Sequence, residues 1–183
     1  MAHITASVEY GVHSLIWLVG EDARPMSSRE LAELAGVSPS FVAKIFPKLE
    51  KAGIVRASEG VRGGYLLAKP AKHISFLEII DAIEGEKPLF DCREVRLQCP
   101  LFGKDPPNWA AKGTCAIHAV MLHAEKAMRE ALAGQSLGDV AERFGRKAPP
   151  EFWGVVKDWL DDNADTRIGK PEPASKRKRR RAP

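Results

Sequence analysis

The residues best suited to chemistry are the three cysteines, Cys92, Cys99 and Cys115, which all fall in one stretch from 91 to 118. That stretch has no clear helix or strand pattern before Thr114, and a long irregular loop inside a compact domain is usually functional or disordered. Thiolates bind zinc and iron–sulfur clusters and carry redox chemistry. The spacings of seven and sixteen residues contain neither the short knuckles of a zinc site nor a C-x-x-C redox pair. The residues therefore favour an iron–sulfur cluster, and leave a thiol switch or a structural role open.

A different class of function would be an enzyme with a single cysteine as its nucleophile. Cys115 precedes a predicted helix, whose dipole would lower the pKa of its thiol. A nucleophilic enzyme also needs a general base and an oxyanion site. The sequence nominates neither beside Cys115, so we predict that the protein is not an enzyme.

Two predicted helices ahead of the cysteines are clearly punctuated. Ser27 and Glu30 form a capping box for the first, and Gly36 ends it. Ser38 and Pro39 open the second, which runs to Gly53 with a kink expected at Pro47. Two helices joined by a short turn predict a helix-turn-helix. Its second helix would enter the major groove of double-stranded DNA.

The residues expected to touch DNA lie on this second helix and on the segment that follows it. Polar side chains at the start and along one face suit base-edge and phosphate contacts. Residues 54–69 read as a β-hairpin with a glycine-rich turn, which would be a wing beside the helix-turn-helix. Solvated faces and incidental arginines are the alternatives. The predicted DNA-binding residues are Ser38, Ser40, Lys44, Lys48, Arg56 and Arg62.

Further predicted helices surround the cysteine stretch. One spans 6–19, and Glu9 and His13 share a face of it. A second spans 75–83, with Ser75 and Glu78 as another capping box. A long one begins at the cap Thr114 and carries an apolar stripe with period 3.6, which favours a protruding dimerisation helix. Short helices follow at 136–143 and 151–160, the latter with Phe152, Trp153, Val156 and Trp159 turned inward.

Charge and hydropathy complete the outline. The formal net charge is +4, but six consecutive basic residues, 176–181, leave the rest of the chain at −2. A nearly neutral body can still bind DNA through one basic face, and the tail would add non-specific attraction. There is no run of 18 apolar residues and no secretory pattern. We therefore expect a cytoplasmic protein without a membrane partner.

The whole order resembles a known family. Its most specific pieces are SPSFVAKIFPKLEKAGIV in the recognition helix, GGYLLAK at the end of the wing and CAIHAV at the start of the long helix. The chain resembles, over residues 4–145, the IscR/NsrR/RirA-type winged-helix regulators of the Rrf family. These are dimeric bacterial transcription regulators, several of which hold an iron–sulfur cluster.

The resemblance also suggests cluster ligands. Cys92, Cys99 and Cys115 occupy the three cysteine positions of the family, although the gap between the last two is longer than usual. His118 matches the histidine of IscR-like members. Glu9 and His13 match RsrR-like redox regulators, in which these residues of the partner's first helix join two cysteines on a [2Fe–2S] cluster. The resemblance favours this set, with Cys99 and Cys115 preferred, and a [2Fe–2S] over a [4Fe–4S] cluster.

We therefore predict a homodimeric, mainly α transcriptional repressor with a small β wing. It would sense redox state, iron or nitric oxide through an iron–sulfur cluster and bind promoter DNA. The expected parts are a winged helix-turn-helix domain at 1–85, a cluster loop at 86–113, a dimerisation helix with a short following helix at 114–146, and an extension at 147–183. A cluster-free regulator switched by cysteine oxidation or by a partner protein is the alternative.

Overall fold

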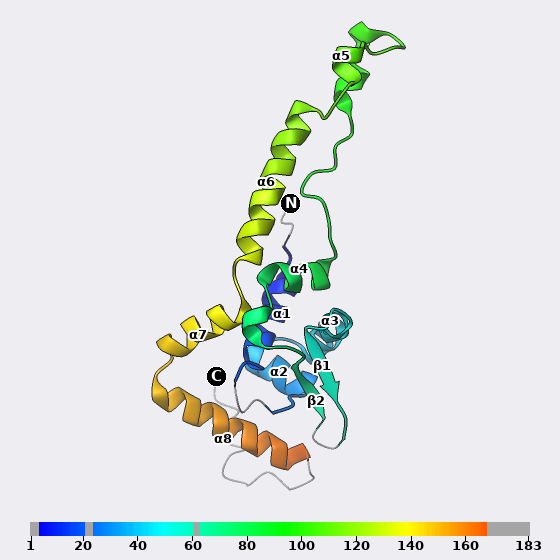
Figure 1. Ribbon diagram of the computed structural model, residues 1–183. Coiled ribbons are helices and arrows are strands. Elements are labelled where there is room, and N and C mark those ends of the chain that lie inside the picture. The colour runs from blue at the N-terminus through cyan, green and yellow to red at the C-terminus, as the bar shows by residue number, and fades with distance from the viewer. Residues whose placement is uncertain (1–3, 21–23, 61–62, 168–183) are drawn as a thin grey trace.

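The computed structural model describes residues 4–20, 24–60 and 63–167. A helical domain with a small hairpin forms the base, and one long helix with its preceding loop rises from it as an arm (Figure 1). The prediction of a mainly α fold with a β wing is confirmed. In chain order the elements are α1 (Ala6–Ile16), α2 (Ser28–Ala35), α3 (Pro39–Lys51), β1 (Val55–Ser58), β2 (Gly64–Leu67), η1 (Ala71–His73), α4 (Phe76–Glu84), η2 (Val95–Gln98), η3 (Pro100–Phe102), α5 (Asn108–Ala111), α6 (Ala116–Ala133), α7 (Leu137–Lys147) and α8 (Pro150–Arg167).

The helix-turn-helix forms as its punctuation predicts. The Ser27 hydroxyl accepts from the Glu30 amide while the Glu30 carboxylate accepts from the Ser27 amide, which is a complete capping box. Gly36 ends α2 at φ 68°, a left-handed conformation that favours glycine. Pro39 then begins α3, which continues through Pro47 to Lys51 as one helix.

α1 is shorter than the predicted helix 6–19. It ends at Ile16, and the amides of Leu18 and Val19 then bond the carbonyls of Leu15 and Ile16, three residues back. This tighter turn brings Leu18 into the core, where it is 1% exposed. Burial of a large apolar side chain therefore overrides continuation of the helix.

The core of the base is built from the apolar faces of α1, α2, α3 and α4. Phe46 and Leu49 of α3 are fully buried, as are Leu31 of α2 and Ile79 of α4. Leu137, at the start of α7, also lies in this cluster. The core therefore fixes the recognition helix against the elements on either side of the wing.

Each of the two glycines of the GGYLLAK motif, Gly63 and Gly64, is required because a side chain at its position would clash with a different part of the backbone. A Cβ at Gly63 would lie 2.5 Å from the Ser58 carbonyl oxygen, inside the hairpin turn. A Cβ at Gly64 would lie 2.5 Å from the backbone of Met26, where Met26 and Tyr65 exchange two backbone hydrogen bonds of 3.1 and 2.8 Å. The second glycine thus lets the wing dock on the segment that leads into α2.

α4 differs from its predicted bounds of 75–83 by one residue at each end. The Ser75 hydroxyl accepts from the Glu78 amide, but the Glu78 carboxylate forms an ion pair with Lys69 at 2.5 Å. The predicted second capping box is therefore only half formed, because a cation competes for its carboxylate. At the other end of α4, the Ile83 carbonyl accepts from Nζ of Lys48 at 2.6 Å.

The arm consists of the cysteine loop and α6. The loop was expected to be irregular, yet it contains the short helical turns η2, η3 and α5. The predicted cap Thr114 is wrong by one residue, since Cys115 is the N-cap and its side chain makes no capping bond. None of the residues of α6 is buried in the described chain. Arg129 of α6 attaches the arm to the base through two hydrogen bonds to Asp81 of 3.2 and 2.8 Å. Within the arm, Glu125 of α6 accepts from the Leu89 amide of the loop.

α7 continues past its predicted end to Lys147, because the first prolines after Ser136 are Pro149 and Pro150. α8 begins at Pro150 and continues past its predicted end to Arg167. Phe152 of α8 lies near Trp17, with ring centroids 6.4 Å apart. Trp153 was expected to point inward, but it is 41% exposed, although its ring meets those of Phe144 and Phe152. None of the described helices combines the length and the apolarity that a membrane crossing requires.

Candidate DNA interface and metal centre

The start of α3 presents the predicted DNA-reading side chains to solvent. Ser38, Ser40 and Lys44 are exposed, and the hydroxyls of Ser38 and Ser40 lie 2.5 Å apart. Hydroxyl and ammonium groups at the N-terminal end of a recognition helix are suited to base edges and phosphates. Lys48 is placed differently, since its ammonium donates to the C-terminal carbonyl of α4. Lys48 therefore links the recognition helix to α4.

The wing carries Arg56 on β1, paired in register with Leu66 of β2. Arg56 is exposed, so its guanidinium is available for a phosphate. Arg62, the other predicted wing arginine, lies outside the described residues. The predicted basic tail at 176–181 lies outside them as well.

In the arm, the structure brings Cys92 together with Glu94 and His118. One ligand atom from each, a thiol sulfur, a carboxylate oxygen and an imidazole nitrogen, lies within 4.8 Å of the others. Cys92 Sγ is 3.8 Å from Glu94 Oε1, and the Phe90 ring approaches the His118 ring. All three are partly exposed. Sulfur, nitrogen and oxygen ligand atoms that lie this close together suit a transition metal or an iron–sulfur centre.

Arg96 organises this part of the loop. Its Nε donates to Glu94 Oε2 at 2.8 Å, and its NH2 group donates to the carbonyls of Gly113 and Ala111 at 2.6 and 3.4 Å. Arg96 thereby ties the segment after Cys92 to the segment before Cys115.

Arg96 and Glu94 shift each other's pKa values. Its hydrogen bond to Glu94 raises the pKa of Arg96, and the nearby Cys115 and Cys92 add to that increase. The same hydrogen bond lowers the pKa of Glu94, with a smaller contribution from His118. Glu94 also has the left-handed φ of 48°, which is uncommon outside glycine. Glu94 is therefore held as a carboxylate beside Cys92.

The other predicted ligands are distributed along the molecule. Cys115 is the N-cap of α6, and Cys99 joins η2 to η3. All three cysteines are free and partly exposed. Glu9 and His13 are exposed on α1, which packs on α4 in the base (Figure 1). The structure thus groups Cys92 with His118, and does not bring Glu9 or His13 into that group.

Two residues of this site were missed by the sequence reasoning. Glu94 and Arg96 were not singled out, because charged residues in a polar loop ordinarily face solvent. The alternation of acid and base in DCREVR, directly around a cysteine, was the available signal.

Comparison with known proteins supplies the identity of the fold. Residues 4–143 match the model of the Rrf2 family, described as iron-dependent transcriptional regulators. The chain belongs to the Rrf2 family. It is a DNA-binding transcriptional regulator and not an enzyme, as predicted. The match ends before α8, so the C-terminal extension lies outside the family region.

A curated relative agrees with this assignment, and solved structures share the fold. Over 139 residues the chain is 28% identical to the transcriptional repressor NsrR of Streptomyces coelicolor, covering 75% of this chain and 86% of that protein. The fold is similar to that of CymR, the global cysteine regulator of B. subtilis, with a TM-score of 0.59 and 23% identity, covering 78% of this chain and 98% of CymR. It is equally similar to IscR of T. potens, with a TM-score of 0.59 and 22% identity, covering 82% and 95% of the two chains.

Proposed function

We propose that this Rrf2 regulator is a homodimeric repressor that senses redox state, iron or nitric oxide through an iron–sulfur cluster in its cysteine loop. The observation that carries the proposal is the arrangement of the arm. Three free, partly exposed thiols share one arm with His118, and the Arg96 guanidinium joins the segment after Cys92 to the segment before Cys115. The family description as iron-dependent adds support.

The donor set fits such a cluster chemically. Cysteine thiolates are the usual ligands of iron–sulfur clusters, and histidines replace some of them in certain [2Fe–2S] centres. We propose a [2Fe–2S] centre held by cysteines of the set Cys92, Cys99 and Cys115 with Glu9 and His13 from the partner subunit. Replacing thiolates by imidazole and carboxylate lowers the negative charge at the irons and raises the reduction potential. When bound, the cluster would supply one-electron redox chemistry, and the charge at its ligands would change with its oxidation state.

Glu9 and His13 can serve only across a dimer. α1 packs on α4, and α4 is bound to the lower part of α6 through Asp81 and Arg129. Cys115 precedes Arg129 by fourteen residues, which is about 21 Å along a helix at 1.5 Å per residue. The α1 of the same subunit therefore stays with the base, away from the cysteines. Within one subunit, the ligands other than cysteine that lie near Cys92 are His118 and Glu94.

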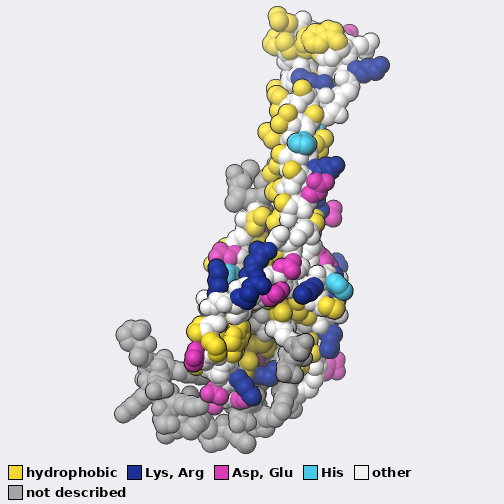
Figure 2. Space-filling model, turned by 60° about the vertical axis from the view of Figure 1, so that its left-hand side comes forward, with side chains coloured by type: hydrophobic (Ala, Val, Ile, Leu, Met, Phe, Trp, Pro, Cys, Tyr) yellow, Lys and Arg dark blue, Asp and Glu magenta, His cyan; other side chains and the backbone are white. Residues whose placement is uncertain are grey.

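A dimer is supported by the exposed apolar face of α6. Ile117 and Val120, one turn apart on the same face, are 63% and 65% exposed. Figure 2 shows apolar side chains following the arm up to its tip. A long helix that buries none of its residues in the described chain lacks the tertiary packing that stabilises most helices. Pairing of two such helices would bury this face and present two recognition helices to a two-fold DNA site.

The structure also offers a route from the arm to DNA. α6 is bound to α4 through Arg129 and Asp81, and α4 is bound to the recognition helix through Ile83 and Lys48. A ligand state that moves α1 or the base of α6 relative to α4 would alter the placement of α3. To change DNA affinity, the cluster state must favour one arrangement energetically.

The test is anaerobic purification with a visible spectrum and assays of iron and sulfide. We expect broad visible bands and about two irons per chain, the number that a [2Fe–2S] centre requires. About four irons would indicate a [4Fe–4S] centre. His13→Ala is expected to change the spectrum and to alter DNA binding, whereas His123→Ala on the exposed middle of α6 serves as the control. An unchanged spectrum in His13→Ala, with loss of the cluster in His118→Ala, would replace the partner's ligands by His118.

A cluster-free regulator switched by thiol oxidation is the second candidate. The free state and partial exposure of all three cysteines favour it. A colourless, iron-free protein after anaerobic purification would support this candidate. Its DNA affinity, measured on duplexes selected from a random-sequence pool, should then change with a thiol oxidant and return with a dithiol reductant.

A further inference from the structure

α8 encloses a large hollow against the base of the molecule. Its first turns meet the base where Phe152 approaches Trp17, and its later part is held where Arg24 donates to the Leu160 carbonyl at 2.6 Å. Between these two attachments lies a cavity of about 1290 Å³. Its other walls are the end of α1, the strand β2, η1 and α7. Small-molecule sites typically measure roughly 300–1,000 Å³, so the cavity has room for an organic ligand and water.

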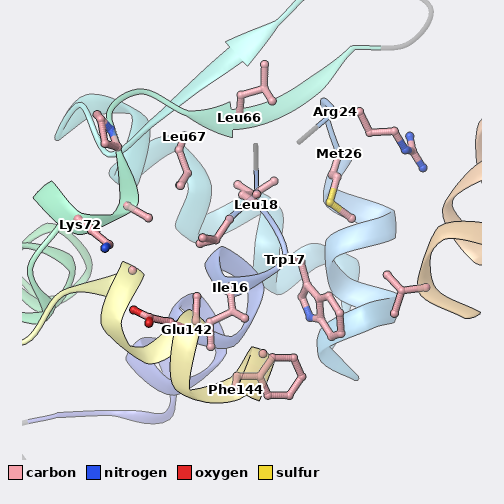
Figure 3. Close-up of a pocket in the computed structure, with 18 of the residues that line it drawn as sticks. Ile16, Trp17, Leu18, Arg24, Met26, Leu66, Leu67, Lys72, Glu142 and Phe144 are labelled. Atoms are coloured by element: carbon pink, nitrogen blue, oxygen red, sulfur yellow. The ribbon is translucent and has the colours of Figure 1, made fainter. Parts of the chain in front are cut away.

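The lining is apolar in the middle and charged at its ends. Figure 3 shows Leu18, Leu67 and Met26 toward the middle, with Lys72 and Glu142 at one end and Arg24 at the other. Leu18 and Met26 are almost fully buried, whereas Trp17, Leu67 and Phe144 of the lining are partly exposed and form an apolar floor. An apolar body would gain from contact with this floor.

The charges of the lining favour an anion. Five Lys and Arg side chains line the cavity against two carboxylates. Arg24 and Lys69 form ion pairs with Glu30 and Glu78. In the described part of the chain, neither Arg56 nor Lys72 has a carboxylate within ion-pair distance, while Glu142 is paired with Arg146 at 3.0 Å. A ligand with a carboxylate or sulfonate can therefore gain charge-assisted hydrogen bonds there.

We propose that this cavity is a binding site for a small amphipathic organic anion, with an apolar body and one acidic head group. The apolar body lies over Trp17, Leu67 and Phe144, and the head group binds near Lys72. The basic run 176–181 has the same sign as the lining cations, which disfavours this segment of the chain as the occupant. The cavity depends on α8, outside the family match, so the site is specific to chains with this extension.

The test uses the full-length protein and the fluorescent probe anilinonaphthalene sulfonate, which has an aromatic body and a sulfonate. Because Trp17 and Trp153 line the cavity, we expect saturable energy transfer from tryptophan to the bound probe. Decanoate should displace the probe and decanol, which lacks the charge, should do so much less. Equal displacement by the two would overturn the assignment of an anionic ligand.

Matched variants locate the binding. Val156→Trp adds bulk to the lining, and Val155→Trp adds the same bulk at a neighbouring position that is 65% exposed and outside the lining. We expect Val156→Trp to weaken probe binding about tenfold and Val155→Trp to leave it nearly unchanged. Equal binding by the two variants would place the probe elsewhere, for example on the apolar face of α6, and would overturn the proposal.

A charge variant tests the head-group position without adding bulk. Lys72→Met retains the side-chain stem that packs beside Gly138 and removes the ammonium. We expect it to weaken decanoate binding severalfold, while Lys126→Met, on an exposed ion pair of α6, has no effect. If Lys72→Met binds decanoate as the unchanged protein does, the head group does not lie at this end and the proposal fails in that part.

Occupancy of the cavity should also be felt at the DNA interface, a consequence that rests on the wing's contact with DNA. Arg56 and Leu66, which pair across the hairpin, both belong to the lining. Binding free energies are coupled reciprocally, so decanoate should change affinity for a selected duplex by the same factor as the duplex changes affinity for decanoate. Unchanged affinities in both directions would remove this regulatory role, whereas the binding assays without DNA test the site itself.

Discussion

Gly64→Ala tests how the wing is held against the helix-turn-helix. The new Cβ would lie 2.5 Å from the carbonyl carbon and oxygen of Met26 and 2.9 Å from its nitrogen. These are backbone atoms of a residue that is 2% exposed, so they cannot move aside as a flexible side chain can. The strand β2 must therefore separate from Met26.

The expected cost follows from the contacts that this separation breaks. Two backbone hydrogen bonds join Met26 and Tyr65, and each contributes about 0.5–1.5 kcal/mol. The Tyr65 ring also packs on Phe46 with centroids 4.8 Å apart, a contact worth about 0.5–1.5 kcal/mol. Replacing glycine restricts the unfolded chain and offsets about 0.4–1 kcal/mol. The net loss in the free energy of unfolding is about 2 kcal/mol.

The assay is urea denaturation followed by circular dichroism, together with DNA affinity on a selected duplex. Gly64→Ala should lower the denaturation midpoint and weaken DNA binding while sequence preference, carried by α3, is retained. Gly20→Ala is the control, because a Cβ there meets no atom within 4 Å. Equal stability of the two variants would refute the reasoning that the Met26 contact holds the wing.

Three further predictions follow from individual contacts. Lys48→Met should lower the free energy of unfolding by about 1 kcal/mol, because the bond to the Ile83 carbonyl is lost, whereas Lys44→Met should leave urea unfolding unchanged and weaken DNA binding; the reverse pattern would contradict the two assigned roles. Burial, with Glu50 nearby, raises the pKa of Tyr65 above its usual value of about 10, so its contribution to stability is fully present below about pH 10 and is lost as pH rises through the raised pKa. The Tyr10→Phe variant retains Tyr65 as its single tyrosine, so alkaline titration of its absorbance should show a tyrosine pKa above about 10. A midpoint at or below that value would refute the raised pKa of Tyr65. Deletion of residues 170–183 should weaken DNA binding and reduce its salt dependence with the preferred sequence retained; a large loss of sequence preference would show that the tail reads bases.

Much of the base could be predicted from local sequence signals. The capping box of Ser27 and Glu30 and the left-handed Gly36 determine where α2 begins and ends, and these signals act within a few residues of the chain. The Gly–Gly pair before Tyr65 likewise marks the wing. The signals were less reliable where a distant residue competed, as when Lys69 took the Glu78 carboxylate and left the second capping box half formed.

The cysteine loop shows the same division more sharply. The sequence by itself placed three thiols in one loop and matched them to a family, but it could not say which of them approach each other, because loops are shaped by contacts distant in the chain. The tertiary structure decided that Cys92 lies with Glu94 and His118. It also decided that Arg96 joins the segment after Cys92 to the segment before Cys115. The cavity beneath α8 is likewise a product of tertiary packing alone: each wall comes from a different element, and no local pattern records the space between them.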